Sequence, residues 1–205
     1  MIIELSKEEE MNKYKSRRSN DIYLFSNVFS EDTCNKLVDY INKNAKDRLV
    51  VDKSQNVQGY QMYILMDNPF FKSISSKLID IGKFVNNKYF ITFGCYGKYN
   101  HELITIRKID GPTQLHQDGS VYDVDSSRVN GNMMVSVDQV RTLSVIIALN
   151  GDYDGGEIVF PCQNFKTKLK QGEAIAFPPY WTHPHYTEDL KNNTFRYTIN
   201  TWLTL

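Results

Sequence analysis

Two side chains in the stretch TQLHQDGS, residues 113–120, have the chemistry of metal ligands. His116 and Asp118 are separated by one residue, and in an extended chain the side chains of such a pair point the same way. An imidazole and a carboxylate at this spacing can therefore reach one metal ion. The alternative is an ordinary polar turn, because this triplet also arises by chance.

A further metal ligand is available near the end of the sequence. Of the four histidines in the chain, His183 and His185 lie close together in the stretch YWTHPHY. Two histidines and one carboxylate form a facial set that binds iron(II) and leaves coordination positions open for a cosubstrate and oxygen. We therefore expect one of these histidines to join His116 and Asp118; both point the same way in an extended chain, so side-chain direction does not decide between them.

Arg196 and Thr198 form a pair that can bind a carboxylate. They are two residues apart in the strand-like run FRYTINTWL, so their side chains face the same way. An arginine presents a planar fork of donors that matches a carboxylate, whereas a lysine offers only a point charge. Metal ligands and an anion-binding pair thus follow one another in the order that a single site needs.

Short strands dominate the sequence from about residue 88 onward, and these strands must position the site. Runs rich in β-branched and aromatic residues alternate there with Gly, Asn, Asp and Pro. This pattern predicts a β-sandwich or barrel braced by helices on its outside. The predicted strands are NKYFITFG, ELITIRKI, TLSVIIALN, GEIVFP, EAIAFP and FRYTINTWL.

Two amphipathic helices are predicted in the first half of the chain, where a strand, DIYLFSNVF, leads into the first of them. In that helix Ser30 is placed to N-cap, and apolar residues from Cys34 to Ile41 recur on one face. The second helix starts near Asn68 and Pro69, and its apolar residues recur every three or four positions as far as Val85. Both apolar faces must pack on a partner, for which the sheet is the natural choice.

The composition predicts one domain over residues 1–205, with residues 1–20 as a mobile lead-in or an edge element. The chain is 41% apolar, which is enough for a sizeable core. Lysine plus arginine equals aspartate plus glutamate at 24 each, so no net charge favours a nucleic acid or a membrane surface as partner. The sequence does not set an oligomeric state.

The cysteines and the N-terminal residues predict a soluble, cytoplasmic protein. Three cysteines without CxxC spacing fit neither a disulfide framework nor a zinc knuckle. The first 20 residues contain no apolar run of signal-peptide length, and no later run is long enough to span a membrane.

Together these motifs resemble the iron(II)- and 2-oxoglutarate-dependent oxygenases, and within them the prolyl 4-hydroxylase-like branch. The resemblance covers about residues 22–203, and the combination is far more specific than any single motif. The matching segments are IYLFSNVFSEDTCNKLVDYI, IRKIDGPTQLHQDGS, RTLSVIIALNGDYDGGEIVFP, KLKQGEAIAFPPYWTHPH and TFRYTINTWL.

The resemblance implies a mainly β fold with flanking helices: a double-stranded β-helix, or jelly-roll, with helices packed on one sheet. It implies that His116, Asp118 and a C-terminal histidine bind iron, and the family spacing before the basic residue favours His185 over His183. It also implies that Arg196 holds the distal carboxylate of 2-oxoglutarate. The resemblance further implies a hydrogen bond from Thr198 to that carboxylate.

The implied activity is that of a dioxygenase that hydroxylates an unactivated C–H bond, with a prolyl residue of a peptide or protein as the leading substrate. Its cofactors are iron(II) and 2-oxoglutarate, with O2 as cosubstrate and ascorbate as an optional addition. One alternative is a hydroxylase of a free amino acid or another small molecule. Others are a non-catalytic jelly-roll protein that binds a metal or ligand, and an enzyme that uses a different metal.

The sequence departs from the family pattern in the strand before the HxD triplet. A tyrosine that touches the cosubstrate is common there, whereas this chain has Lys108 three residues before Gly111. Another residue must then complete the pocket, and Tyr63, Tyr96 and Tyr99 are the candidates.

Three other features of the sequence can each be interpreted in two ways. Arg141 either reaches the substrate or caps the end of the barrel. Trp202 either faces the cosubstrate pocket or belongs to the core. The acidic turn at residues 154–157 is either a metal site or a hairpin turn, and its glycines favour the turn.

Overall fold

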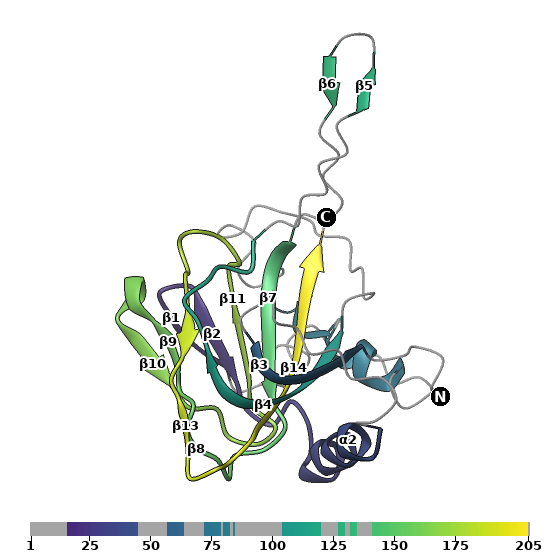
Figure 1. Ribbon diagram of the computed structural model, residues 1–205, viewed down its shortest axis with the longest axis vertical. Coiled ribbons are helices and arrows are strands. Elements are labelled where there is room, and N and C mark those ends of the chain that lie inside the picture. The colour runs from purple at the N-terminus through teal and green to yellow at the C-terminus, as the bar shows by residue number, and fades with distance from the viewer. Residues whose placement is uncertain are drawn as a thin grey trace.

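A seven-stranded antiparallel sheet forms the centre of the molecule (Figure 1). The computed structural model describes residues 16–44, 57–63, 72–78, 80–82, 84, 104–119, 127–129, 132–134 and 141–204. The sheet has the order β1-β2-β11-β7-β14-β4-β3. Its strands are β1 (Ser16–Ser19), β2 (Ile22–Phe25), β3 (Val57–Tyr63), β4 (Thr105–Thr113), β7 (Arg141–Ala148), β11 (Ala174–Phe177) and β14 (Arg196–Thr204).

Smaller sheets accompany the central one. A three-stranded sheet has the order β10-β9-β12, and β8 pairs with β13. A short 3-10 helix connects β9 to β10. These elements are β8 (Asp154–Gly155), β9 (Ile158–Phe160), η1 (Pro161–Gln163), β10 (Phe165–Thr167), β12 (Tyr186–Thr187) and β13 (Leu190–Lys191).

The two predicted helices cover one face of the central sheet. Helix α2 (Glu31–Lys43) begins where predicted, because the Ser30 hydroxyl accepts a hydrogen bond from the backbone N–H of Thr33. Residues 72–78 are helical as well. Their buried side chains share one core with alternate residues of the sheet: Cys34, Leu37 and Ile41 from α2, and Ile74 and Leu78 from the second helix. The predicted cap at Asn68 and Pro69 lies outside the described residues, as does the predicted strand NKYFITFG.

A second core lies on the opposite face of the sheet, between it and β9. Strand residues alternate between the two cores, so Ile147 packs toward the helices whereas Ile146 packs with Ile158 and Phe160. In Figure 1, α2 and the small-sheet strands β9 and β10 lie on opposite sides of the central strands. This arrangement confirms the predicted double-stranded β-helix with helices packed on one sheet.

Two further segments have a defined backbone geometry. The segment between Asp118 and Arg141 contains a pair of antiparallel strands, β5 (Ser127–Val129) and β6 (Asn132–Met134). Residues 154–157 do not form a hairpin between β8 and β9, because β8 pairs with β13 whereas β9 pairs with β10 and β12; φ is positive at Gly155 and Gly156. A Cβ atom at Gly155 would lie 2.2 Å from the carbonyl oxygen of Asp189, so only glycine fits where β8 meets β13.

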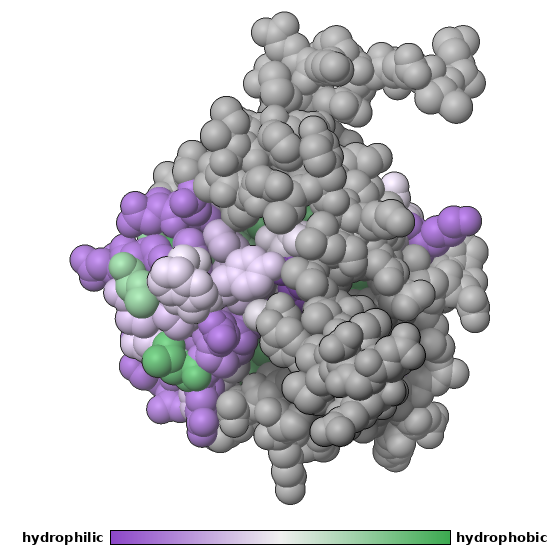
Figure 2. Space-filling model, turned by 90° about the horizontal axis from the view of Figure 1, so that it is seen from above, coloured by the Kyte–Doolittle hydropathy of each residue, from purple (hydrophilic) through white to green (hydrophobic). Residues whose placement is uncertain are grey.

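The surface shown in Figure 2 is mostly hydrophilic over the residues described there, with scattered hydrophobic side chains. Among the described residues, the exposed large hydrophobic side chains are Leu115, Trp181 and Phe195. Among the described residues, no helix is long and apolar enough to cross a membrane.

Candidate metal centre and carboxylate pocket

Two segments far apart in the sequence meet at the candidate metal centre. The chain that leaves β4 and the chain that enters β12 pair through His116 and His185, each of which donates its backbone N–H to the carbonyl of the other at 3.0 and 2.9 Å. This short antiparallel bridge places the two imidazoles on the same side, with ring centroids 4.4 Å apart. The backbone thus sets the distance between the two histidines before any ligand binds.

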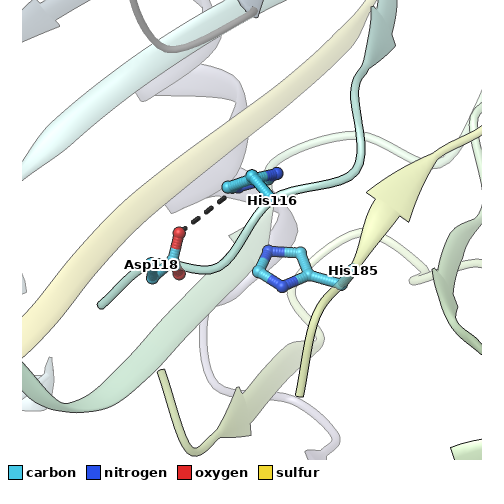
Figure 3. Close-up of side chains that lie close together, drawn as sticks. All are labelled: His116, Asp118 and His185. Atoms are coloured by element: carbon cyan, nitrogen blue, oxygen red, sulfur yellow. Dashed lines mark ion pairs between the residues drawn. The ribbon is translucent and has the colours of Figure 1, made fainter. Parts of the chain in front are cut away.

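Asp118 completes a group of three ligand side chains. Figure 3 shows its carboxylate and the imidazoles of His116 and His185 converging on a common space. The nearest contact joins His116 Nε2 to Asp118 Oδ1 at 3.4 Å, and one ligand atom from each residue lies within 4.8 Å of the others. Two histidines and one carboxylate at these separations can bind one metal ion on a single face.

Hydrogen bonds to backbone carbonyls orient both imidazoles. Nδ1 of His116 lies 2.8 Å from the carbonyl oxygen of Gln114, and Nδ1 of His185 lies 3.2 Å from that of His183. A carbonyl only accepts, so each contact favours the tautomer that carries its proton on Nδ1. In the neutral form of each ring the lone pair is then on Nε2, which is the arrangement that a metal-binding histidine adopts.

The ionisation of these groups suits a cation. Burial lowers the pKa of His185 to about 4, so this imidazole is neutral near pH 7. Burial alone would raise the pKa of Asp118, but the hydrogen bond with His116 and the charge of His185 outweigh it and hold that pKa well below its usual range. A neutral imidazole and an ionised carboxylate are the forms that bind a metal.

His116 differs from His185 in this respect. Burial lowers its pKa, but the hydrogen bond and the negative charge of Asp118 raise it more, and the net effect is a raised pKa. Without a metal, the carboxylate of Asp118 favours a proton on the His116 ring. A bound metal would take the place of that proton.

His183 does not join the group. Its Nε2 lies 3.0 Å from the carbonyl oxygen of Asn20, and its Nδ1 lies 2.9 Å from the hydroxyl of Thr182. The side chain is buried against the turn between β1 and β2. Of the two C-terminal histidines, the structure therefore brings His185, the residue favoured by the sequence, to His116 and Asp118.

Arg196 lies buried in the same pocket as the three ligand side chains. Its Nη1 donates to the carbonyl of Gly156 at 2.7 Å, and its Nη2 donates to the hydroxyl of Thr187 at 3.3 Å. Its Nε has no hydrogen-bond partner among the described residues. Burial lowers the pKa of Arg196 to about 10, so the guanidinium stays charged near pH 7. The segment at residues 154–157 thus helps to position Arg196 through the carbonyl of Gly156.

Thr198 and Asn200 continue the pocket wall along β14. Both are buried, and the Thr198 hydroxyl donates to Asn200 Oδ1 at 2.7 Å. The pocket unites all five predicted site residues with polar and apolar neighbours. Its lining consists of Arg107, Ile109, Thr113, His116, Asp118, Ile146, Ile158, His185, Thr187, Arg196, Thr198 and Asn200.

Arg107 is the charged pocket residue that the sequence analysis missed. It is 7% exposed and lies on β4, directly opposite Thr198 on β14. Lys108, where the family tyrosine was sought, points to the other face, where its Nζ donates to Asn42. Alternation counted back from His116 would place Arg107 on the opposite face, because the two positions differ by nine; the bend at Leu115 breaks the period of two, so spacing gave no signal for Arg107.

Of the tyrosines suggested as replacements, Tyr63 lies in β3 opposite Thr105. Tyr96 and Tyr99 lie outside the described residues.

Arg141 and Trp202 pack against each other beside the metal centre. The Arg141 guanidinium lies 3.8 Å from the centroid of the Trp202 ring, and its Nη1 donates to the carbonyl of Asp118 at 2.7 Å. Trp202 is buried, and Arg107 lies 5.9 Å from the same ring. Arg141 thereby braces the segment that carries Asp118, a role in addition to the two considered from the sequence.

The chain is similar to several known proteins. It is 25% identical over 162 residues to a protein of Acanthamoeba polyphaga mimivirus whose name marks it as a proposed prolyl 4-hydroxylase. This alignment covers 78% of the present chain and 61% of the relative, so the chain spans about three fifths of the length of that protein. No family model matches the chain.

Solved structures of prolyl hydroxylases share the fold. The viral collagen prolyl hydroxylase of Paramecium Bursaria Chlorella virus-1, in its 2OG complex, has a TM-score of 0.66 at 20% identity and covers 90% of this chain and 96% of its own. The prolyl hydroxylase of Trichoplax adhaerens, in complex with a hypoxia inducible factor peptide fragment, has a TM-score of 0.66 at 16% identity, with 90% and 84% coverage. The predicted resemblance to the prolyl 4-hydroxylase-like branch is thereby confirmed.

Proposed function

We propose that this protein is an iron(II)- and 2-oxoglutarate-dependent dioxygenase that hydroxylates a prolyl residue of a peptide or protein. The observation that carries the proposal is the convergence of His116, Asp118 and His185 in one pocket with a buried arginine. The fold and the named relatives support the same enzyme class.

The donor set fits iron(II). Two imidazole nitrogens and one carboxylate lie within 4.8 Å of one another, and a set of this kind binds one face of iron(II) with positions left for further ligands. Iron(II) bound there would supply chelation of a 2-oxo acid and activation of oxygen. The protein contributes the orientation of both rings through the carbonyls of Gln114 and His183.

Arg196 fits the role of an anchor for the distal carboxylate of 2-oxoglutarate. Two of its nitrogens are held by Gly156 and Thr187, so the guanidinium is fixed in place before the cosubstrate enters. A fixed, buried cation binds a carboxylate without first losing side-chain entropy. Thr198, two residues along β14, could donate to the same carboxylate if its hydroxyl turned away from Asn200 Oδ1.

The substrate assignment rests on the relatives. The virus and Trichoplax proteins are named as prolyl hydroxylases, and the second was solved with a peptide. A peptidyl proline is therefore the first substrate to test, followed by free amino acids and other small molecules.

Anaerobic titration of the iron(II)-loaded protein with 2-oxoglutarate tests the proposal. Chelation of the keto acid to iron should produce a weak visible charge-transfer band that saturates with added 2-oxoglutarate. A folded, iron-loaded protein that gives no band would refute the proposal and favour a non-catalytic metal-binding protein.

Replacement of Arg196 by methionine sharpens this test. We expect 2-oxoglutarate affinity to fall about ten- to a hundredfold, the range for a lost hydrogen bond to a charged group, while iron affinity is unchanged. Lys166→Met is a matched control, because Lys166 is exposed and pairs with Glu188 away from the pocket. Equal 2-oxoglutarate affinity in Arg196→Met and the control would remove Arg196 from its proposed role.

A further inference from the structure

Trp181 is the most exposed of the large hydrophobic side chains in the described part of the chain. It is 79% exposed, whereas Trp202, the second tryptophan of the protein, is 5% exposed. Tryptophan is buried to a large extent in most proteins, but a single exposed hydrophobic side chain is also common and carries no function by itself. A functional role for Trp181 therefore depends on how the backbone holds it and where.

Trp181 occupies the second position of a β-turn formed by residues 180–183. The backbone N–H of His183 donates to the carbonyl of Tyr180 at 2.9 Å, which closes the turn. The buried imidazole of His183 anchors the turn, because its Nε2 lies 3.0 Å from the carbonyl oxygen of Asn20. The backbone at Trp181 is thus held in place although the indole itself is exposed.

Two further hydrogen bonds place this turn beside the metal centre. The backbone N–H of Gly119 donates to the carbonyl of Pro179 at 2.7 Å, and Gly119 directly follows Asp118 in the chain. The side-chain amide of Gln163 donates to the carbonyl of Thr182 at 2.6 Å. In Figure 1 the connection that follows β11 accordingly passes next to the chain that leaves β4. The exposed indole is therefore held near the proposed active site.

His183 joins the turn to a metal ligand. Its carbonyl oxygen lies 3.2 Å from Nδ1 of His185 and orients that ring. Because the imidazole of His183 also anchors the turn, one residue positions both the metal ligand and the exposed indole. Trp181 itself is not among the residues that line the pocket of the metal ligands. It lies on the surface outside that pocket, where a substrate longer than one residue would extend.

An indole in this position matches a proline-rich peptide. Its flat face packs against the apolar ring of a prolyl residue, and its N–H, at the ring edge, donates to a peptide carbonyl. Proline-rich segments adopt the polyproline II conformation, which leaves their carbonyls unpaired and is already ordered before binding. A free amino acid bound at the metal would make no use of an aromatic side chain outside the pocket.

We propose that Trp181 binds a second prolyl residue of a proline-rich peptide substrate, outside the pocket that takes the residue to be hydroxylated. This inference rests on the proposed function and deepens it, because it narrows the substrate class from any prolyl residue to an extended segment with several prolines. His183 is the positioning residue that holds the turn. A turn that is ordered before the peptide arrives reduces the entropy lost on binding.

Fluorescence tests the contact directly. The probes are decaproline, which adopts the polyproline II conformation, and free L-proline at the same concentration of residues. Each is added to the iron(II)-loaded protein without oxygen, so that no turnover occurs. Binding of decaproline should move the emission of Trp181 to shorter wavelength in a saturable way, because the indole leaves water, whereas free proline should cause no shift.

Three variants extend the test, with the affinity for decaproline measured by isothermal titration calorimetry. Trp181→Ala should weaken binding about tenfold or more, the loss typical of an aromatic contact residue. Trp181→Phe keeps a flat ring without the N–H, so it should weaken binding less and abolish the emission shift. Phe195→Ala is the matched control and should bind as the unaltered protein does. Phe195 is an exposed aromatic residue whose ring contacts Lys108, on the face of the sheet that α2 covers.

Three results would overturn the inference. They are an unchanged emission of the unaltered protein with decaproline, a shift that persists in Trp181→Phe and so comes from Trp202, and equal affinity in Trp181→Ala and Phe195→Ala. If circular dichroism shows that Trp181→Ala does not fold, the emission of Trp181→Phe decides. Failure of the proposed function looks different, because the iron-loaded protein would then give no charge-transfer band with 2-oxoglutarate, whatever the peptide does.

Discussion

The residues of β14 that face the helices differ in chemistry from those that face the pocket. Tyr197 and Ile199 join the apolar core beneath α2, whereas Arg196, Thr198 and Asn200 are equally buried on the opposite face. These two sets alternate along one strand, so a single stretch of sequence serves both purposes.

The two faces contribute to the protein in different ways. The helix-covered face stabilises the fold, because each square ångström of buried apolar surface contributes about 25 cal/mol. The pocket face buries charged and hydroxyl groups, which costs folding free energy unless partners accompany them. Stability is therefore concentrated on one face of the sheet and binding on the other.

The largest expected effect is on iron binding, which should separate His185 from its neighbour His183. His185→Ala should abolish detectable iron binding and turnover, because it removes one of three ligands. His183→Ala should leave iron affinity within about threefold, since its side chain bonds to Asn20 and Thr182 instead. Iron binding would be measured by anaerobic titration, with circular dichroism as the check that both variants fold. Loss of iron in His183→Ala with retention in His185→Ala would exchange the two roles.

A pair of neighbours on β14 tests the separation of stability from binding. Ile199→Ala should lower the free energy of unfolding by about 2–5 kcal/mol, because it opens a cavity under the helices. Thr198→Val removes a buried hydroxyl that donates to Asn200 and should cost about 1 kcal/mol, while weakening 2-oxoglutarate binding severalfold. Urea denaturation and cosubstrate titration measure the two effects. An equal loss of unfolding free energy in Thr198→Val and Ile199→Ala would show that the two faces do not differ in their contribution to stability.

The helix-covered face was the more predictable from sequence. Periodic apolar residues and the Ser30 cap predicted α2, and both features are present in the structure. Runs of β-branched and aromatic residues likewise predicted β7, β11 and β14 to within a residue or two. Local patterns suffice here because burial on one face repeats with the period of the element itself.

The pocket was predictable only in part. His116 and Asp118 are near in sequence, and Arg196 and Thr198 share a strand, so spacing alone indicated each pair. Arg107 was missed because its place depends on the register of β4 against β14, which joins residues about ninety positions apart. The register of two strands is set when they pair in the folded protein, and the spacing of residues within one strand does not reveal it.

The protonation of His185 makes the stability of the folded protein depend on pH. In the unfolded chain its imidazole has the ordinary pKa of 6.5 and takes up a proton below it, whereas the folded protein resists protonation until about pH 4. Stability without metal is therefore lost as the pH falls from 6.5 toward 4. At pH 5 the loss from this residue should reach about 2 kcal/mol.

His116 acts in the opposite direction, because its folded pKa is raised and protonation of this ring favours the folded state. The comparison of His185→Gln with the unaltered protein isolates the contribution of His185. Urea denaturation of the metal-free proteins at pH 7, 6 and 5 should show a weaker pH dependence in the variant. Parallel curves would mean that burial of His185 does not oppose its protonation, and the neutral imidazole proposed as a metal ligand would then lose its physical basis.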